Sequence, residues 1–167
     1  MNAADLRTAQ APLKAAYRED PSAAHVTLKA SGTPDVPEQV CRVHTFLGVV
    51  DAGLHPATGG DGTKACSGDM LLEALVACAG VTLGAVATSM GIALKSARVG
   101  AEGVIDFRGT LGVSREAPVG FREIRLRFEL ETDAEPEAQR KLIDLTERYC
   151  AIYQTLKHPA VLESTTG

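Results

Sequence analysis

Apolar and polar residues alternate along several short stretches of the chain, a pattern typical of strands with one buried face. The clearest stretch is 124–131, where four apolar side chains alternate with two arginines and two glutamates. Residues 25–30 and 98–108 alternate in the same way. Residues 39–50 are predicted to form a strand that pairs with 25–30 across a turn at 33–35. Because the strands have one polar face, we expect an antiparallel sheet that is covered on one side.

A long apolar helix is predicted between Ser67, a favourable N-cap residue, and Gly91, where the helix should end. No charged residue occurs from position 74 to 94. The segment is apolar on nearly every face, so we expect protein around nearly all of it. Its length also matches a membrane span. The abundance of small residues and the lack of flanking aromatic or basic anchors favour a buried helix without a membrane partner.

A second helix is predicted to begin at Pro136, because proline is tolerated in the first helical turn. Its apolar stripe has helical spacing and consists of Ala138, Leu142, Leu145 and Tyr149. Cys150 follows directly, then a short helix over 151–157 that ends before Pro159. Residues 161–162 are predicted as a last strand. Since helices and hairpins are segregated along the chain, the fold class is α+β.

Composition and charge narrow the class of protein. The 167 residues are 45% apolar and 23% charged, which fits a single domain over 1–167 with a proper core. Residues 1–22 are expected to be a polar lead-in with a short helix at 11–17. The net charge of −4 argues against a nucleic-acid partner. Residues 1–12 do not resemble a secretory signal, so a cytoplasmic location is expected.

The candidate chemistry lies in the cysteines, because a chain in a reducing compartment has reactive or buried thiols in place of structural disulfides. The four are Cys41, Cys66, Cys78 and Cys150. An isolated cysteine inside an apolar helix, such as Cys78, is usually a small core residue. Cys150 lies between two helices, where the amides of Ala151 and Ile152 are predicted to point at its sulfur and lower its pKa.

A zinc site is not favoured. Cys41 and His44 form a C-x-x-H pair, with His55 and Cys66 nearby in sequence. Structural zinc commonly needs two such pairs, and side chains three apart on a strand point to opposite faces. We therefore expect no metal.

Two segments around the cysteines carry a resemblance to a known family. Residues 67–78, SGDMLLEALVAC, resemble the central-helix motif of the OsmC/Ohr family of osmotically induced and organic hydroperoxide resistance proteins. In that motif an acidic residue and a run of Leu and Ala end in Ala-Cys or Gly-Cys. Residues 149–156, YCAIYQTL, are similar to the family's second cysteine motif. The order of predicted elements agrees from about residue 24 to 163.

The resemblance implies a fold, an assembly and an activity. Antiparallel sheets would wrap around a long buried central helix, with two chains intertwined as a homodimer. Cys78 would be the peroxidatic cysteine that attacks small organic hydroperoxides, and Cys150 the resolving cysteine that closes the disulfide. An external dithiol, of the lipoyl kind, would reduce the pair again. The enzyme would be a peroxiredoxin-like hydroperoxide reductase that uses no cofactor.

The residues around the thiolate depart from the family pattern. An acidic residue and an arginine hold the peroxidatic thiolate in the family. Here the acidic residue is Asp69, where part of the family has glutamate, and the arginine is predicted to be Arg42, with Arg18 as the alternative. Ala151 and Tyr153 stand where the family usually has Pro and Ser. These departures keep an alternative open, a non-catalytic protein that binds a small apolar ligand in the dimer cleft.

Overall fold

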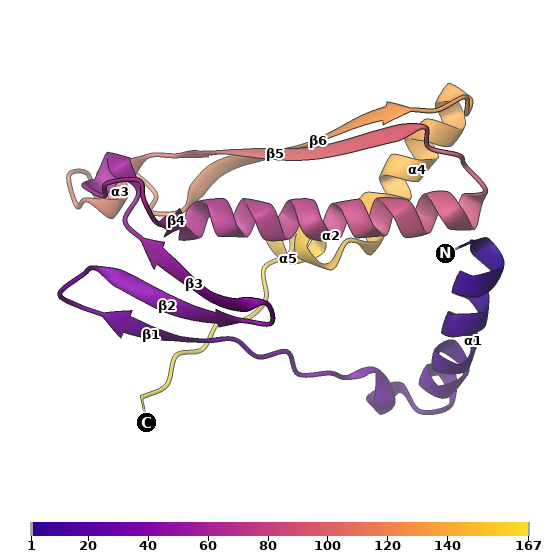
Figure 1. The fold of residues 1–167 in the computed structure, drawn as a ribbon, viewed down its shortest axis with the longest axis horizontal. Helices are drawn as coiled ribbons and strands as arrows, with labels where there is room; N and C mark the ends of the chain where they lie inside the picture. Colours follow the sequence, from indigo (N-terminus) through magenta and orange to yellow (C-terminus); the bar gives the residue numbers. More distant parts are fainter. Residues whose placement is uncertain (1, 167) are drawn as a thin grey trace. The chain divides into compact units, whose positions relative to one another are not determined.

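The computed structural model describes residues 2–166 (Figure 1). Their contacts divide them into two compact units. The first unit contains residues 2–7, 73–101 and 126–166, and the second contains residues 8–72 and 102–125. The longest helix and the two longest strands contribute residues to both units.

A four-stranded sheet is the main feature of the second unit. Strands β1 (Ser31–Asp35), β2 (Val40–Thr45) and β3 (Gly48–Gly53) form an antiparallel meander, and the short β4 (Ala65–Cys66) lies parallel to β3 (Figure 1). The register pairs Cys41 of β2 with Pro34 on one side and Ala52 on the other.

The predicted hairpin exists, but its strands lie elsewhere. Residues 25–30 form no regular element, and Leu28 is 89% exposed, so the prediction of a strand there is wrong. The predicted turn residues 33–35 lie inside β1, and the chain reverses over residues 36–39. An alternating pattern needs a surface that covers its apolar side, and residues 25–30 have none in this structure.

The predicted strand over 39–50 is two strands. Phe46 and Leu47 form the two-residue turn between β2 and β3, although both are large and apolar. Gly48 has a φ of +132°, which an L side chain rarely adopts, and the hydroxyl of Thr45 donates to the Gly48 carbonyl at 2.7 Å. Residues 51–66, predicted as a loop, include the end of β3, a 3₁₀ turn η2 (Pro56–Thr58) and β4.

The N-terminal segment is more helical than predicted. Helix α1 (Ala3–Glu19) extends well beyond the expected residues 11–17 on both sides, and a 3₁₀ turn η1 (Pro21–Ala24) follows. None of the residues of α1 is buried. The helix continues through Pro12 and has no buried apolar stripe from which its length could have been predicted.

Helix α2 (Ser67–Met90) occupies the predicted range and ends at Gly91, whose φ is +69°. Its buried residues form one stripe with a spacing of four, Leu75, Ala79, Leu83 and Ala87. The opposite face is open, and Val81 is 77% exposed. The expectation that protein surrounds nearly all of α2 is therefore wrong for the single chain. By length and composition alone, this helix would be able to cross a membrane.

The first unit packs α2 against helix α4 (Pro136–Tyr149) and the paired strands β5 (Ser96–Ile105) and β6 (Phe121–Glu131). β6 and α4 contain the predicted ranges. β5 ends three residues before the predicted residue 108, because Asp106 caps a short helix, α3 (Phe107–Thr110), by accepting the Arg108 N–H. Further apolar residues pack around Leu83, Ala87 and Leu142, namely Val86, Met90, Ile92, Leu94, Val99, Phe128, Leu130 and Ile143. This combination of antiparallel strands and segregated helices is the α+β class that the sequence predicts.

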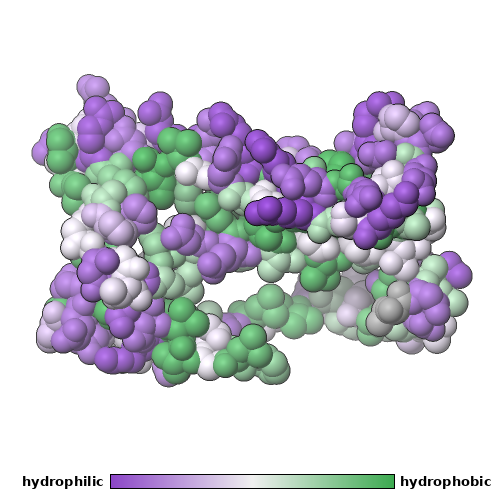
Figure 2. Space-filling view, turned by 45° about the horizontal axis from the view of Figure 1, so that its top comes forward, coloured by the Kyte–Doolittle hydropathy of each residue, from purple (hydrophilic) through white to green (hydrophobic). Residues whose placement is uncertain are grey.

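The C-terminal segment is partly as predicted. Helix α5 (Ala151–Lys157) follows α4 after one residue, Cys150. Tyr149, placed on the apolar stripe by its spacing, is 62% exposed, and residues 161–162 form no strand. Apolar side chains reach the surface elsewhere too, and Figure 2 shows hydrophobic residues in green among hydrophilic residues in purple.

Candidate functional site

The side chains of Cys78 and Cys150 meet in the first unit. Cys78 lies in the interior of α2, and Cys150 is the single residue between α4 and α5. Their thiols are close enough for each to shift the pKa of the other, and neither forms a disulfide. Cys150 is fully buried and Cys78 is half-buried. Two thiols separated by 72 positions in sequence are thus neighbours in space.

A break in the helical backbone at Cys150 shapes this site. Cys150 has extended dihedral angles, with φ of −75° and ψ of 108°. Its N–H donates to the carbonyl of Thr146 at 2.9 Å and closes α4, while its carbonyl accepts the N–H of Gln154 at 3.0 Å and opens α5. The first amides of a helix have no carbonyl partner within that helix. The N–H groups of Ala151 and Ile152 are therefore available to the site.

These amides act on Cys78. Burial by itself would raise the pKa of the Cys78 thiol. Hydrogen bonds from the Ile152 N–H, the Cys150 thiol, the Ala151 N–H and the Thr82 hydroxyl outweigh burial, so the pKa lies below its ordinary value. Donors that stabilise the charged form lower the pKa of an acid, and a thiolate is the nucleophilic form of cysteine.

Cys150 has the opposite shift. Burial raises the pKa of its thiol most, and the hydrogen bond and negative charge of Cys78 raise it further. The Tyr153 N–H, 3.5 Å from the Cys150 sulfur, opposes this only in part. The predicted lowering of the Cys150 pKa by the Ala151 and Ile152 amides is confirmed only for the direction in which the Ile152 N–H acts, because the net shift is upward. Both amides also help to lower the pKa of Cys78.

Thr82 is a site residue that the sequence reasoning missed. It lies four residues after Cys78 on α2, so the two side chains share one face of the helix. Its hydroxyl makes the smallest of the contributions that lower the pKa of Cys78. The spacing of four was visible in the sequence, but threonine is common in helices and carries no signal without a known sulfur beside it.

The other predicted site residues belong to the second unit. Asp69 is exposed in the first turn of α2, where a carboxylate suits the helix dipole. Arg42 lies on β2 and forms an ion pair with Asp35 at 3.0 Å. Arg18 is exposed in the last turn of α1. The roles of these residues beside Cys78 stay predictions from the resemblance.

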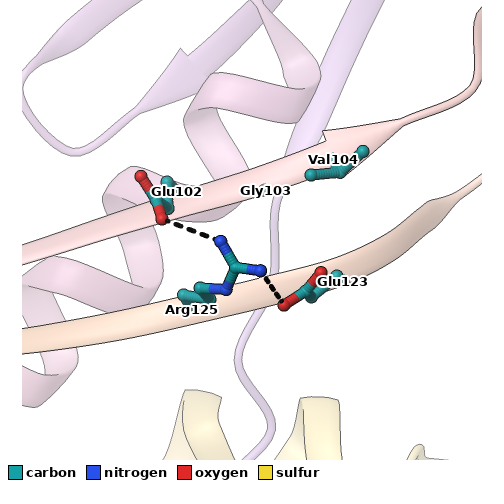
Figure 3. Close-up of a pocket in the computed structure, with 5 residues that line it drawn as sticks. All are labelled: Glu102, Gly103, Val104, Glu123 and Arg125. Atoms are coloured by element: carbon teal, nitrogen blue, oxygen red, sulfur yellow. Dashed lines mark hydrogen bonds and ion pairs between the residues drawn. The ribbon is translucent and has the colours of Figure 1, made fainter.

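A second cluster of charged residues lines a pocket of about 230 Å³ on β5 and β6 within the second unit. Figure 3 shows the guanidinium of Arg125 between the carboxylates of Glu123 and Glu102, at 2.6 and 3.5 Å. The arginine is thus neutralised by its own neighbours, which makes the cluster a poor anion site. Among residues 2–166, no three His, Cys, Asp or Glu side chains converge as metal ligands would.

Comparisons with known proteins agree with this fold and motif pattern. The family model of OsmC-like proteins matches residues 60–165. Comparison with curated proteins gives no match. Among solved structures, an OsmC-like protein from Mycoplasma pneumoniae is 16% identical, with a TM-score of 0.67 over 80% of this chain and 89% of that chain.

Two similar structures are of organic hydroperoxide resistance proteins. The one from Legionella pneumophila is 13% identical, with a TM-score of 0.62 over 80% of this chain and 93% of that chain. OhrB of Bacillus subtilis is 17% identical, with a TM-score of 0.54 over 79% and 93%. Identities this low establish the common fold alone. With the family model covering well over half of its residues and the fold agreeing, the chain belongs to the OsmC-like protein family.

Proposed function

We propose that this protein reduces organic hydroperoxides with two cysteines, Cys78 as the peroxidatic residue and Cys150 as the resolving residue. The observation that carries the proposal is the meeting of the two thiols, with the pKa of Cys78 lowered and that of Cys150 raised. Hydroperoxide resistance among proteins of the same fold supports the choice of substrate.

The reaction balances with the groups present and an external dithiol. The Cys78 thiolate attacks one peroxide oxygen, the O–O bond breaks, and the alcohol leaves after it takes up a proton. Cys78 is then a sulfenic acid. The sulfur of Cys150 attacks the Cys78 sulfur, water leaves, and a disulfide joins the two residues. A dithiol, proposed to be of the lipoyl kind, reduces the disulfide by thiol exchange and is itself oxidised.

The surroundings of the two sulfurs suit these separate roles. A peroxidatic cysteine must be a thiolate at neutral pH, and the donors around Cys78 favour that form. A resolving cysteine must lie next to the sulfenic acid before further oxidation occurs, and Cys150 does. No organic or metal cofactor enters this scheme.

The decisive experiment measures consumption of cumene hydroperoxide and of hydrogen peroxide with dithiothreitol as reductant. Cys78→Ser should abolish turnover, because the attacking thiolate is lost. Cys150→Ser should allow one oxidation of Cys78 and then stall as sulfenic or sulfinic acid, visible by mass spectrometry. Cys41→Ser and Cys66→Ser serve as matched controls, since both are half-buried cysteines outside the pair, and should retain turnover. No turnover above that of dithiothreitol alone would favour a ligand-binding protein.

We also propose that the protein acts as a cytoplasmic homodimer. The open face of α2 supports the dimer, because Val81 is largely exposed to water on a helix that is otherwise strongly apolar. Gly80 and Gly84 lie on the same helix, and a Cβ added at either would meet nothing within 4 Å in the single chain. Small residues of this kind allow a second helix to approach closely.

A further inference from the structure

The helix break at Cys150 leaves a carbonyl without its usual partner. In a continuous α-helix the N–H of Ala151 would donate to the carbonyl of Glu147, four residues earlier. Here the Ala151 N–H lies near the Cys78 sulfur, where it helps to lower the pKa of that thiol. The Glu147 carbonyl instead accepts the side-chain amide of Gln154, with Nε2 at 2.9 Å.

The position of Gln154 explains how one side chain bridges the break. Its own N–H opens α5 by donating to the Cys150 carbonyl at 3.0 Å, and its carbonyl accepts the N–H of His158 at 2.8 Å. Its side chain is half-buried and reaches back over the break to the last turn of α4. A free carbonyl beside the break would otherwise compete for the Ala151 N–H, because a buried carbonyl without a donor is costly.

We propose that Gln154 is a positioning residue: its side-chain amide occupies the Glu147 carbonyl and so leaves the Ala151 N–H directed at the sulfur of Cys78. Without that amide, the Glu147 carbonyl would take the Ala151 N–H and draw α4 and α5 towards one continuous helix. The amides that face Cys78 would then turn away from it. This inference rests on the proposed function only in assigning the reactive thiolate to Cys78.

The test uses the full-length protein and Gln154→Met, which keeps the length of the side chain but removes the donor. The readout is the rate of iodoacetamide labelling of the Cys78 peptide against pH, followed by mass spectrometry. The midpoint should rise by about half a pH unit, as expected when one of several donors to the sulfur is lost. Below the midpoint this corresponds to a roughly threefold loss of thiolate. Cys150 is the titratable neighbour of Cys78, so its labelling is recorded beside it.

Gln139→Met is the matched control. Gln139 makes the same kind of bond at the other end of α4, with Nε2 donating to the Ala134 carbonyl at 2.7 Å. It should leave the Cys78 midpoint unchanged. An unchanged midpoint in Gln154→Met, or an equal shift in both variants, would overturn the proposal.

A double-mutant cycle separates positioning from general stability. Ala151→Pro removes the N–H that Gln154 is proposed to protect, so Gln154→Met should shift the Cys78 midpoint less in that background than alone. Equal shifts in both backgrounds would contradict the proposal. If Gln154→Met does not fold, Gln154→Asn replaces it, since its amide is one methylene too short. Because labelling needs no peroxide, this result stands apart from whether the protein is a peroxidase.

Discussion

Replacing Ala151 by proline tests how much one backbone N–H contributes to the reactivity of Cys78. Proline has no N–H and therefore removes one of the two amides that face the sulfur. Proline suits the backbone at this position, because Ala151 is the first residue of α5. The preceding residue, Cys150, has an extended conformation with ψ of 108°, as residues before proline prefer. The Ala151 side chain is exposed, so the ring has space. The change should cost the fold little.

The size of the effect follows from the donors that remain. A hydrogen bond to a charged group contributes about 1.5–3 kcal/mol, and one pKa unit corresponds to about 1.4 kcal/mol. Sulfur is a weak acceptor, and the Ile152 N–H, the Cys150 thiol and the Thr82 hydroxyl still face Cys78. The pKa of Cys78 should therefore rise by about half a unit to one unit.

The assay is the pH dependence of Cys78 alkylation, with Ala151→Ser as the control that keeps the N–H. The sign is fixed by the direction of the shift: a lowered pKa keeps Cys78 reactive as pH falls, so the variant should lose reactivity first on the acid side. Circular dichroism confirms that both variants are folded. An unchanged midpoint in a folded Ala151→Pro protein would refute the assignment of this amide to Cys78.

Two further substitutions test packing and assembly. Leu142→Ala removes a fully buried side chain from the core of the first unit. It should lower the free energy of unfolding, measured by urea titration, by about 2–5 kcal/mol. A smaller loss would mean that the core around Leu142 is less tightly packed than in the structure. Val81→Glu places a charge on the open face of α2 and should convert the proposed dimer into monomers in sedimentation experiments. A monomeric parent protein, or a dimer that survives the charge, would argue against this interface.

The sequence predicted those elements whose pattern matches a buried surface. From Ile124 to Glu131 in β6 every second residue is apolar and half-buried, so the alternation was decisive. The two ends of helix α2 could be predicted from Ser67 and Gly91, because helix capping depends on residues at the helix ends themselves. The α+β class followed from the order of such elements.

Elements that depend on contacts with the rest of the fold could not be predicted from the sequence alone. Residues 25–30 alternate as well as β6 does, but no surface covers them. Helix α1 has no buried face, so periodicity could not delimit it. The turn at Phe46 and Leu47 depends on the conformation of Gly48, and large apolar residues do not indicate a turn.

The candidate site shows the same division. The resemblance singled out Cys78 and Cys150, but their spacing of 72 residues says nothing about distance. From the sequence, free amides were also predicted at the start of α5 and were assigned to Cys150, the nearest sulfur in the chain. In the structure both amides also act on Cys78 of α2, which could be predicted only from knowledge of how α4 and α2 pack.

The coupling between the two thiols gives the proposed reaction an order in time. Part of what keeps Cys150 protonated is the negative charge on its neighbour. Once Cys78 has become a neutral sulfenic acid, that charge is gone, and Cys150 ionises more readily at the moment when its attack is needed. Before oxidation the same charge keeps Cys150 from competing for the peroxide. In the proposed reaction the first step thus favours ionisation of the thiol that carries out the second.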